Sequence, residues 1–147
     1  MVIVGGYSDS YLFYNTEVTT REIIGLVLAG NLQSSSTIIT GGMLVESLEN
    51  LHDAVKRLDN SDVPKENSFS LMFSCFSRGS MTYGYENAQC LSLSEAFPRT
   101  PVVGFFGTAA FGCHREKLKT RGLKPGGRDF LHLDATVLCL TSLAPLK

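Results

Sequence analysis

The chain has 147 residues, the size of one domain with a hydrophobic core of its own. Apolar residues make up 44% of it and charged residues 18%, as in an ordinary globular protein. No apolar run approaches the roughly 18 residues of a membrane-spanning helix, so no membrane partner is predicted. The net charge of −1 is unlike that of a dedicated nucleic-acid-binding protein, so no nucleic-acid partner is predicted either.

The first forty residues contain short β-prone runs separated by turn-forming residues. We expect strands over residues 1–6, 11–14 and 23–29, and the last is apolar enough to be buried. The strand expected over residues 23–29 ends at Gly30-Asn31, and a second strand that runs back along it is expected over residues 36–40. This pattern predicts a β-hairpin.

The clearest helix is expected over residues 43–58. Apolar residues recur there at spacings of four, three, four and three, on one face (Leu44, Leu48, Leu51, Val55 and Leu58). The stripe lasts barely two heptads, so it indicates a helix packed on a core rather than a coiled coil.

The second half of the chain alternates strands with a helix. We expect a buried strand over 69–76, a weaker helix over 86–97, and strands over 102–106 and 134–143. Residues 115–128 are polar and basic and contain Gly and Pro, which is typical of an exposed connection. The whole is a mixed α/β domain with at least four strands and two helices.

Cysteine usage indicates a reducing compartment. The four cysteines (Cys75, Cys90, Cys113 and Cys139) are widely spaced, and three lie in or beside apolar runs. This favours free thiols over a disulfide framework, and it lacks the closely spaced pairs of a zinc site. The N-terminus lacks the basic residues that begin a secretory signal, so we expect a soluble intracellular protein. We predict no metal and no other cofactor.

Cys75 is a candidate reactive thiol. It ends the predicted buried strand just before Ser77-Arg78-Gly79, so its sulfur would lie at the rim of the sheet, where the Arg78 guanidinium favours the thiolate. The alternative is a buried, inert thiol packed with Phe73.

The segment from Gly107 to Gly112 has the glycine spacing of a phosphate-binding loop. Such a loop continues with Lys and Ser or Thr, whereas Cys113-His114 follow here. The segment is therefore interpreted as a tight glycine turn. Nor do the adjacent Cys113 and His114 indicate a catalytic pair, because catalytic partners are usually distant in the chain. No catalytic residue is predicted.

Charge is distributed unevenly along the chain. Residues 1–98 carry −6 and residues 99–147 carry +5, with six basic side chains in one segment (Arg115, Lys117, Lys119, Arg121, Lys124 and Arg128). Such a segment is usually a solvated loop. Its functional interpretation is a docking surface for an acidic protein, since it lacks the interleaved aromatic residues that stack on nucleic-acid bases.

Two blocks of the sequence resemble the C-terminal half of the FIST domain. The first runs from Val55-Lys56-Arg57-Leu58 through residues 64–69 to 73–79, and the second covers residues 97–107 with Gly112-Cys113 following. Residues 1–40, which include Gly5-Gly6-Tyr7 and residues 26–30, resemble the end of the N-terminal FIST part. The likeness covers nearly the whole chain and implies a boundary between residues 1–42 and a FIST C-terminal domain over 43–147.

The resemblance implies a fold class of α/β (α+β), with a mixed, mainly antiparallel sheet and at least two helices packed on it, of FIST C-terminal type. In F-box proteins that carry FIST modules, the F-box binds the Skp adaptor of an SCF-type ubiquitin ligase and the FIST region receives the protein to be ubiquitinated. A non-catalytic, cytoplasmic and nuclear substrate-recognition subunit is therefore implied. The Skp adaptor and cullin would be reached only through an F-box absent from this chain, which we expect to be a fragment, a truncated isoform or a shortened paralogue.

A protein-docking surface is predicted on the loops over 77–85 and 107–114, flanked by the basic segment. Its candidate residues are Ser77, Arg78, Gly79, Phe106, Gly107, Thr108, Arg115 and Lys117. Without an F-box, such a domain would act in a dominant-negative way by holding substrates that it fails to deliver. Strands left unpaired by a missing N-terminal half also predict self-association.

The alternative function is a sensory domain that binds an amino-acid-like ligand, as proposed for bacterial FIST domains. The family turn after Phe-Phe-Gly is typically polar, with Asn and Glu at its centre. Here Thr108-Ala109-Ala110 stand in their place, which counts against a polar ligand in this loop.

Overall fold

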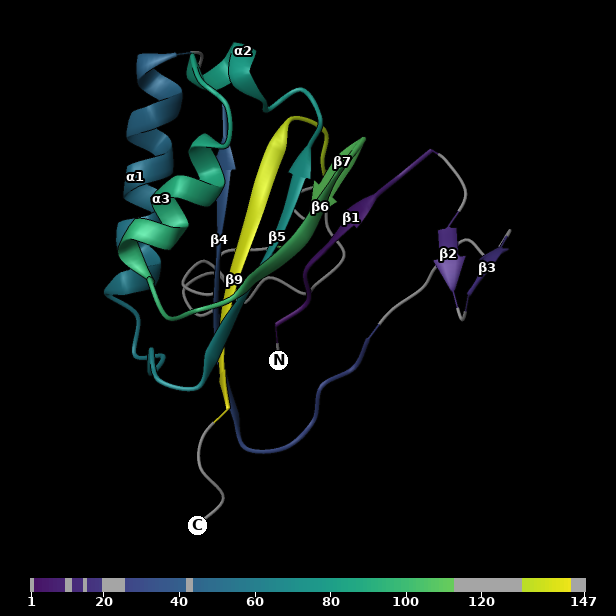
Figure 1. The fold of residues 1–147 in the computed structure, drawn as a ribbon, viewed down its shortest axis with the longest axis vertical. Coiled ribbons are helices and arrows are strands. Elements are labelled where there is room, and N and C mark those ends of the chain that lie inside the picture. Colours follow the sequence, from purple (N-terminus) through teal and green to yellow (C-terminus); the bar gives the residue numbers. More distant parts are fainter. Residues whose placement is uncertain are drawn as a thin grey trace.

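The computed structural model describes residues 2–9, 12–14, 16–19, 26–41, 44–112 and 131–143. In chain order its elements are β1 (Gly5–Tyr7), β2 (Leu12–Tyr14), β3 (Glu17–Thr19), β4 (Leu32–Thr40), α1 (Val45–Asp59), β5 (Ser68–Cys75), α2 (Ser80–Tyr83), α3 (Ala88–Ala96), β6 (Val102–Gly107), β7 (Ala109–Phe111), β8 (Leu131–His132) and β9 (Ala135–Leu143). The predicted α+β class, with helices packed on a mostly antiparallel sheet, is confirmed (Figure 1).

A four-stranded sheet in the order β4-β9-β5-β6 forms the centre of the fold. β9 is antiparallel to both β4 and β5, whereas β5 and β6 run parallel. The carboxyl ends of β5 and β6 therefore lie at the same end of the sheet, which is the upper end in Figure 1. This arrangement brings together the two loops that the sequence singles out.

Helices α1 and α3 cover one face of this sheet (Figure 1). Leu51 and Leu58 of α1 and Leu93 of α3 are almost fully buried with Leu138 and Leu140 of β9. The predicted apolar stripe is thus confirmed as a core face. Its first member, Leu44, is an exception because it precedes the helix and is half exposed.

The opposite face of the sheet is covered in part by a second sheet, in the order β1-β7-β8. Ala110 of β7 and Val4, just before β1, pack there with Ile38 and Val137. Neighbouring residues of one strand point to opposite faces, so Ile38 belongs to this layer and Ile39 to the helix side. The central sheet is therefore apolar on both sides.

The hairpin predicted over residues 23–40 is wrong. Residues 26–29 form no strand, and Val27 is 90% exposed. β4 instead pairs along its whole length with β9, from Leu32 opposite Leu143 to Thr40 opposite Ala135. An apolar run indicates a strand but not its partner, and β9 lies at the far end of the sequence. Residues 23–25 lie outside the described residues.

The later elements follow the prediction more closely. The strands over 69–76, 102–106 and 134–143 and the helix over 86–97 are confirmed as β5, β6, β9 and α3. The tight glycine turn predicted over residues 107–112 is confirmed only at its start, where the Gly107 backbone passes close to Tyr7. Ala109–Phe111 instead form a strand that pairs with β1. The exposed connection predicted over 115–128 lies outside the described residues.

Within the part of the chain that the structure describes, no helix is long and apolar enough to span a membrane. Among the described residues, β4 and β6 are the outer strands of the central sheet. The expected self-association and the domain boundary at residue 42 stay predictions.

Candidate protein-docking site at the carboxyl ends of β5 and β6

Backbone hydrogen bonds join the two predicted loops at the upper end of the sheet. The Phe76 N–H, just after β5, donates to the Gly107 carbonyl at the end of β6 over 2.8 Å. The Thr108 N–H then donates to the Tyr7 carbonyl of β1 over 2.7 Å. A Cβ at residue 107 would overlap this Tyr7 carbonyl, so the close approach requires glycine there.

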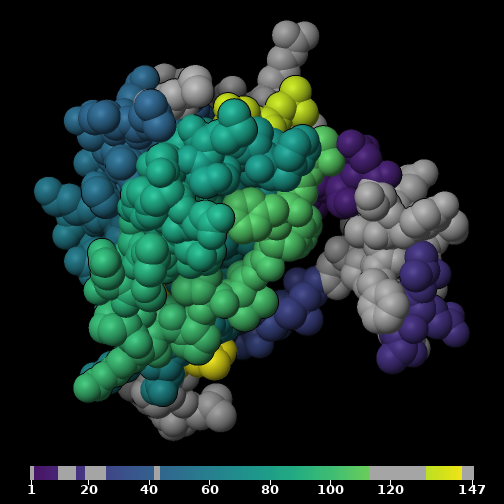
Figure 2. Space-filling view, turned by 45° about the horizontal axis from the view of Figure 1, so that its top comes forward, coloured from purple at the N-terminus to yellow at the C-terminus, as the bar shows by residue number. Residues whose placement is uncertain are grey.

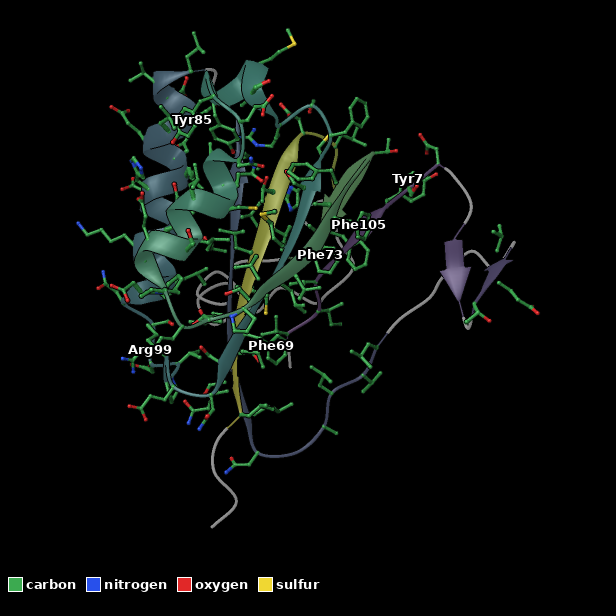
Figure 3. All side chains as sticks on the ribbon, viewed as in Figure 1. Tyr7, Phe69, Phe73, Tyr85, Arg99 and Phe105 are labelled. Carbon is green, nitrogen blue, oxygen red and sulfur yellow. The ribbon has the colours of Figure 1, made fainter. Side chains whose placement is uncertain are left out.

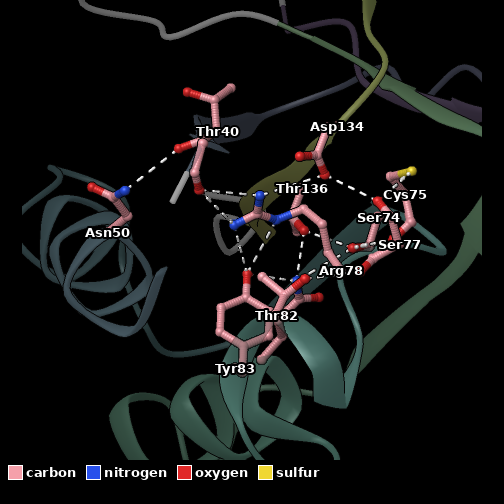
Figure 4. Close-up of polar contacts among 12 residues, drawn as sticks. Thr40, Asn50, Ser74, Cys75, Ser77, Arg78, Thr82, Tyr83, Asp134 and Thr136 are labelled. Carbon is pink, nitrogen blue, oxygen red and sulfur yellow. Dashed lines mark hydrogen bonds and ion pairs between the residues drawn. The ribbon is translucent and has the colours of Figure 1, made fainter. Parts of the chain in front are cut away.

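Arg78, predicted as a surface docking residue, is buried, with 1% of its surface exposed. Its Nε and Nη2 donate to the Tyr83 hydroxyl over 3.3 and 3.2 Å, and both Nη atoms donate to the Gly41 carbonyl over 3.3 and 3.4 Å (Figure 4). Nη1 also lies 3.6 Å from a carboxylate oxygen of the exposed Asp134. A buried guanidinium needs such partners, and here they fix the loop after β5.

Gln89 of α3 extends this polar cluster between the helices and the sheet. Its Nε2 donates to the Tyr83 hydroxyl over 2.9 Å and to the Thr136 hydroxyl over 2.7 Å. The Ser74 and Thr136 hydroxyls lie 2.6 Å apart, which links β5 to β9. The cluster therefore ties α2 and α3 to the ends of β5 and β9.

Cys75 lies beside this cluster and is 4% exposed. Its thiol donates to the Thr108 carbonyl over 3.3 Å, and the Ser77 hydroxyl lies 3.0 Å from its sulfur and 3.0 Å from an Asp134 oxygen. Cys75, Cys90 and Cys139 are free thiols. The burial of Cys75 fits the inert alternative, and its reactivity stays a prediction.

Burial also raises the pKa of the Cys139 thiol, an effect that the hydrogen bond with Thr141 partly offsets. Cys139 lies in β9 at the centre of the sheet, away from the predicted loops. No catalytic arrangement involves it in the described residues.

The other predicted docking residues differ in exposure. Ser77 and Phe106 are exposed, Gly79 and Thr108 are half-buried, and Gly107 is buried. The Thr108 hydroxyl donates to an Asp9 carboxylate oxygen over 3.1 Å. Arg115 and Lys117 lie outside the described residues. Partner binding by these residues stays a prediction.

A group of exposed apolar side chains at this end was missed by the sequence analysis. We call it the α2-end surface, and its members are Leu44 (52% exposed), Val45 (69%), Phe76 (68%), Met81 (83%), Tyr85 (43%) and Phe106 (51%). They come from the start of α1, from α2 and the loops on either side of it, and from β6. Phe76 follows an apolar strand, and this position was interpreted as buried. Sequence type alone could not show that it faces solvent.

Contacts join some of the segments that carry the α2-end surface. The Leu44 N–H donates to the Thr82 carbonyl of α2 over 2.7 Å, and Tyr85 and Phe106 line the same small pocket. Figure 2 tilts this end forward, and the segments around α2 (teal) and β6 (green) lie on one face. Exposed apolar side chains gathered on one face are typical of a protein-interaction site.

The pockets offer little room for a small molecule at this end. The pocket lined by Arg78, Tyr83, Gln89 and Phe106 has a volume of about 40 Å³, the space of one or two water molecules. A hollow of about 610 Å³ lies at the opposite end of the sheet, where Lys65, Phe97 and Arg99 contribute to its walls. The small pocket beside the predicted loops is well below the volume of an ordinary ligand site.

Comparison with known proteins places the chain near F-box proteins. F-box only protein 22 of Homo sapiens and the protein of the same name from Pongo abelii are each 26% identical to it over 157 aligned positions, which cover 100% of this chain. The chain spans 39% of the length of these relatives. No family model matches the chain. The similarity is weak and indicates a relationship to part of an F-box protein.

Proposed function

We propose that the chain is a protein-docking module of the kind that recognises substrates for an SCF-type ubiquitin ligase, acting in the cytoplasm and nucleus. The observation that carries the proposal is the α2-end surface, where exposed apolar side chains lie on a rigidly hydrogen-bonded base. The full-length similarity to F-box only protein 22 supports the ligase context. The module binds the substrate, while the Skp adaptor and cullin are reached through an F-box.

The geometry supports docking because the apolar side chains are exposed and the backbone beneath them is fixed. The Arg78 cluster holds α2, the start of α1 and the end of β5 together. A pre-formed surface of this kind loses little conformational entropy on binding. Apolar anchors such as Phe76 and Met81 are the side chains that contribute most at protein interfaces.

The proposal is tested by joining the chain to an F-box and measuring ubiquitin transfer to the proteins that it retains in cells. The Phe76→Ala/Met81→Ala variant should still associate with the Skp adaptor and cullin but should lose its retained proteins and their ubiquitination. Both side chains are exposed, so folding should be unaffected.

A matched control replaces two exposed apolar residues elsewhere, Val18 in β3 and Leu91 in α3, by alanine. This variant should retain the same proteins as the parent. If the α2-end variant and the control behave alike, or if no retained protein is ubiquitinated with the F-box present, the proposed function is wrong.

A further inference from the structure

The exposed charges that the structure describes at the α2 end are acidic: Asp9, Glu46, Glu86 and Asp134. Of these, Asp134 lies 3.6 Å from the Arg78 guanidinium. Glu46 lies in the first turn of α1, Glu86 follows Tyr85, Asp134 contacts Ser77, and Asp9 accepts from Thr108. Arg78 is the one described cation at this end, and it is buried with its donors already bonded.

The other described cations lie toward the opposite end, where exposed Asp59, Asp62, Glu66 and Glu95 accompany them. Lys56 and Arg57 are in the last turn of α1, roughly 15 Å from Glu46 at about 1.5 Å per residue. Lys65 and Arg99 line the hollow near the starts of β5 and β6. Figure 3 shows Arg99 and Tyr85 toward opposite ends of the molecule.

From this arrangement we infer that the α2-end surface binds a protein segment that presents apolar side chains flanked by Lys or Arg. The apolar side chains would pack on Phe76, Met81 and Phe106, and the basic groups would face Glu46 and Glu86. The inference rests on the proposed function and names the chemistry of its partner. Charges at the rim of an interface select partners and speed their association, so an acidic segment would be repelled.

The inference differs from the expectation of an acidic partner, which was drawn from the basic segment over residues 115–128. That segment lies outside the described residues, so the expectation stays a prediction. Arg78 is withdrawn into the cluster with Tyr83 and the Gly41 carbonyl, so its charge does not face a partner. The described surface beside the apolar patch is then negative.

The test measures fluorescence polarisation of two labelled amphipathic peptides, one of leucine and lysine and one of leucine and glutamate at the same positions. The leucine–lysine peptide should bind at least about tenfold more tightly, and added salt should weaken it. Glu46→Lys/Glu86→Lys should lower its affinity at least about fourfold, because each lost rim charge contributes roughly a factor of two and the new lysines repel the peptide. Phe76→Ala/Met81→Ala should also weaken it.

The control Asp62→Lys/Glu95→Lys makes the same change in net charge on exposed residues away from the α2-end surface. It should leave the affinity for the leucine–lysine peptide unchanged. Equal weakening by both variants would mean that only net charge matters, and equal or tighter binding of the leucine–glutamate peptide would overturn the inference. Peptide binding that disappears when the chain self-associates would instead assign the surface to a second copy.

The inference and the proposed function fail in different ways. If neither peptide binds but Phe76→Ala/Met81→Ala still abolishes ubiquitination in the F-box experiment, the basic partner is wrong and the docking module stands. If the leucine–lysine peptide binds as expected but no retained protein is ubiquitinated, the docking chemistry stands and the ligase role is wrong.

Discussion

The buried guanidinium of Arg78 offers a sharp test of how the α2 end is held together. We expect Arg78→Met to destabilise the protein. Methionine fills much of the same space but cannot donate to the Gly41 carbonyl or the Tyr83 hydroxyl, which accept from Arg78 in the parent. The ion pair with Asp134 adds little, because that carboxylate is largely exposed.

The magnitude follows from the two acceptors. The Gly41 carbonyl belongs to an exposed residue that water can reach, and the Tyr83 hydroxyl keeps the bond from Gln89. The loss is therefore mainly that of hydrogen bonds from a charged donor, about 1.5–3 kcal/mol. Removing a buried charge offsets part of this loss. We therefore expect Arg78→Met to lower the free energy of unfolding by about 1–3 kcal/mol, which for a domain of this size is a fall in Tm on the order of 5 °C.

A double-mutant cycle with Tyr83→Phe isolates the contact itself. Once the Tyr83 hydroxyl is absent, Arg78→Met should cost about 1 kcal/mol less than it does in the parent. Urea unfolding followed by far-UV circular dichroism gives the free energies, and Arg99→Met serves as the control because that arginine is exposed. Parent-like stability of Arg78→Met, or a coupling energy near zero, would refute the structural role of the cluster.

Two further predictions concern the sheet. Gly104→Ala should lower the free energy of unfolding by about 1–3 kcal/mol, because a Cβ there would overlap the Met72 carbonyl of β5. Gly79→Ala has open space and should change it far less in the same urea assay, so equal effects would contradict the close approach of β6 to β5. The raised pKa of Cys139 contributes stability that is fully present below the ordinary thiol pKa of 9.0 and is lost as the pH rises toward the folded value. Cys139→Ala should therefore lose less stability than the parent between neutral and alkaline pH, and parallel curves would be evidence against the shift.

Sequence reasoning located most elements because their signals are local. The spacing of Leu51, Val55 and Leu58 follows the period of a helix, and the apolar runs over β5, β6 and β9 end at turn-forming residues. These signals depend on near neighbours in the chain. They also located the two loops of the candidate site, since both follow strong strands.

Pairing and exposure were decided only by the tertiary structure. β4 pairs with β9 rather than with residues 26–29, because a strand is stabilised by whichever apolar edge the whole chain brings to it. Phe76 is apolar yet exposed, since β5 has ended before it and the chain turns toward α2. The exposure of the α2-end surface could therefore not be predicted from the sequence.

Arg78 is the converse case: a charged side chain that is buried in the folded protein. Its sequence context, at the end of a strand and beside glycine, indicated a surface residue available to a partner. It is buried because acceptors on Gly41 and Tyr83, with Asp134 nearby, come from three other parts of the chain and together replace its hydration. The residue types and their local periods determined the elements, whereas the burial of this charge depended on groups that only folding brings together.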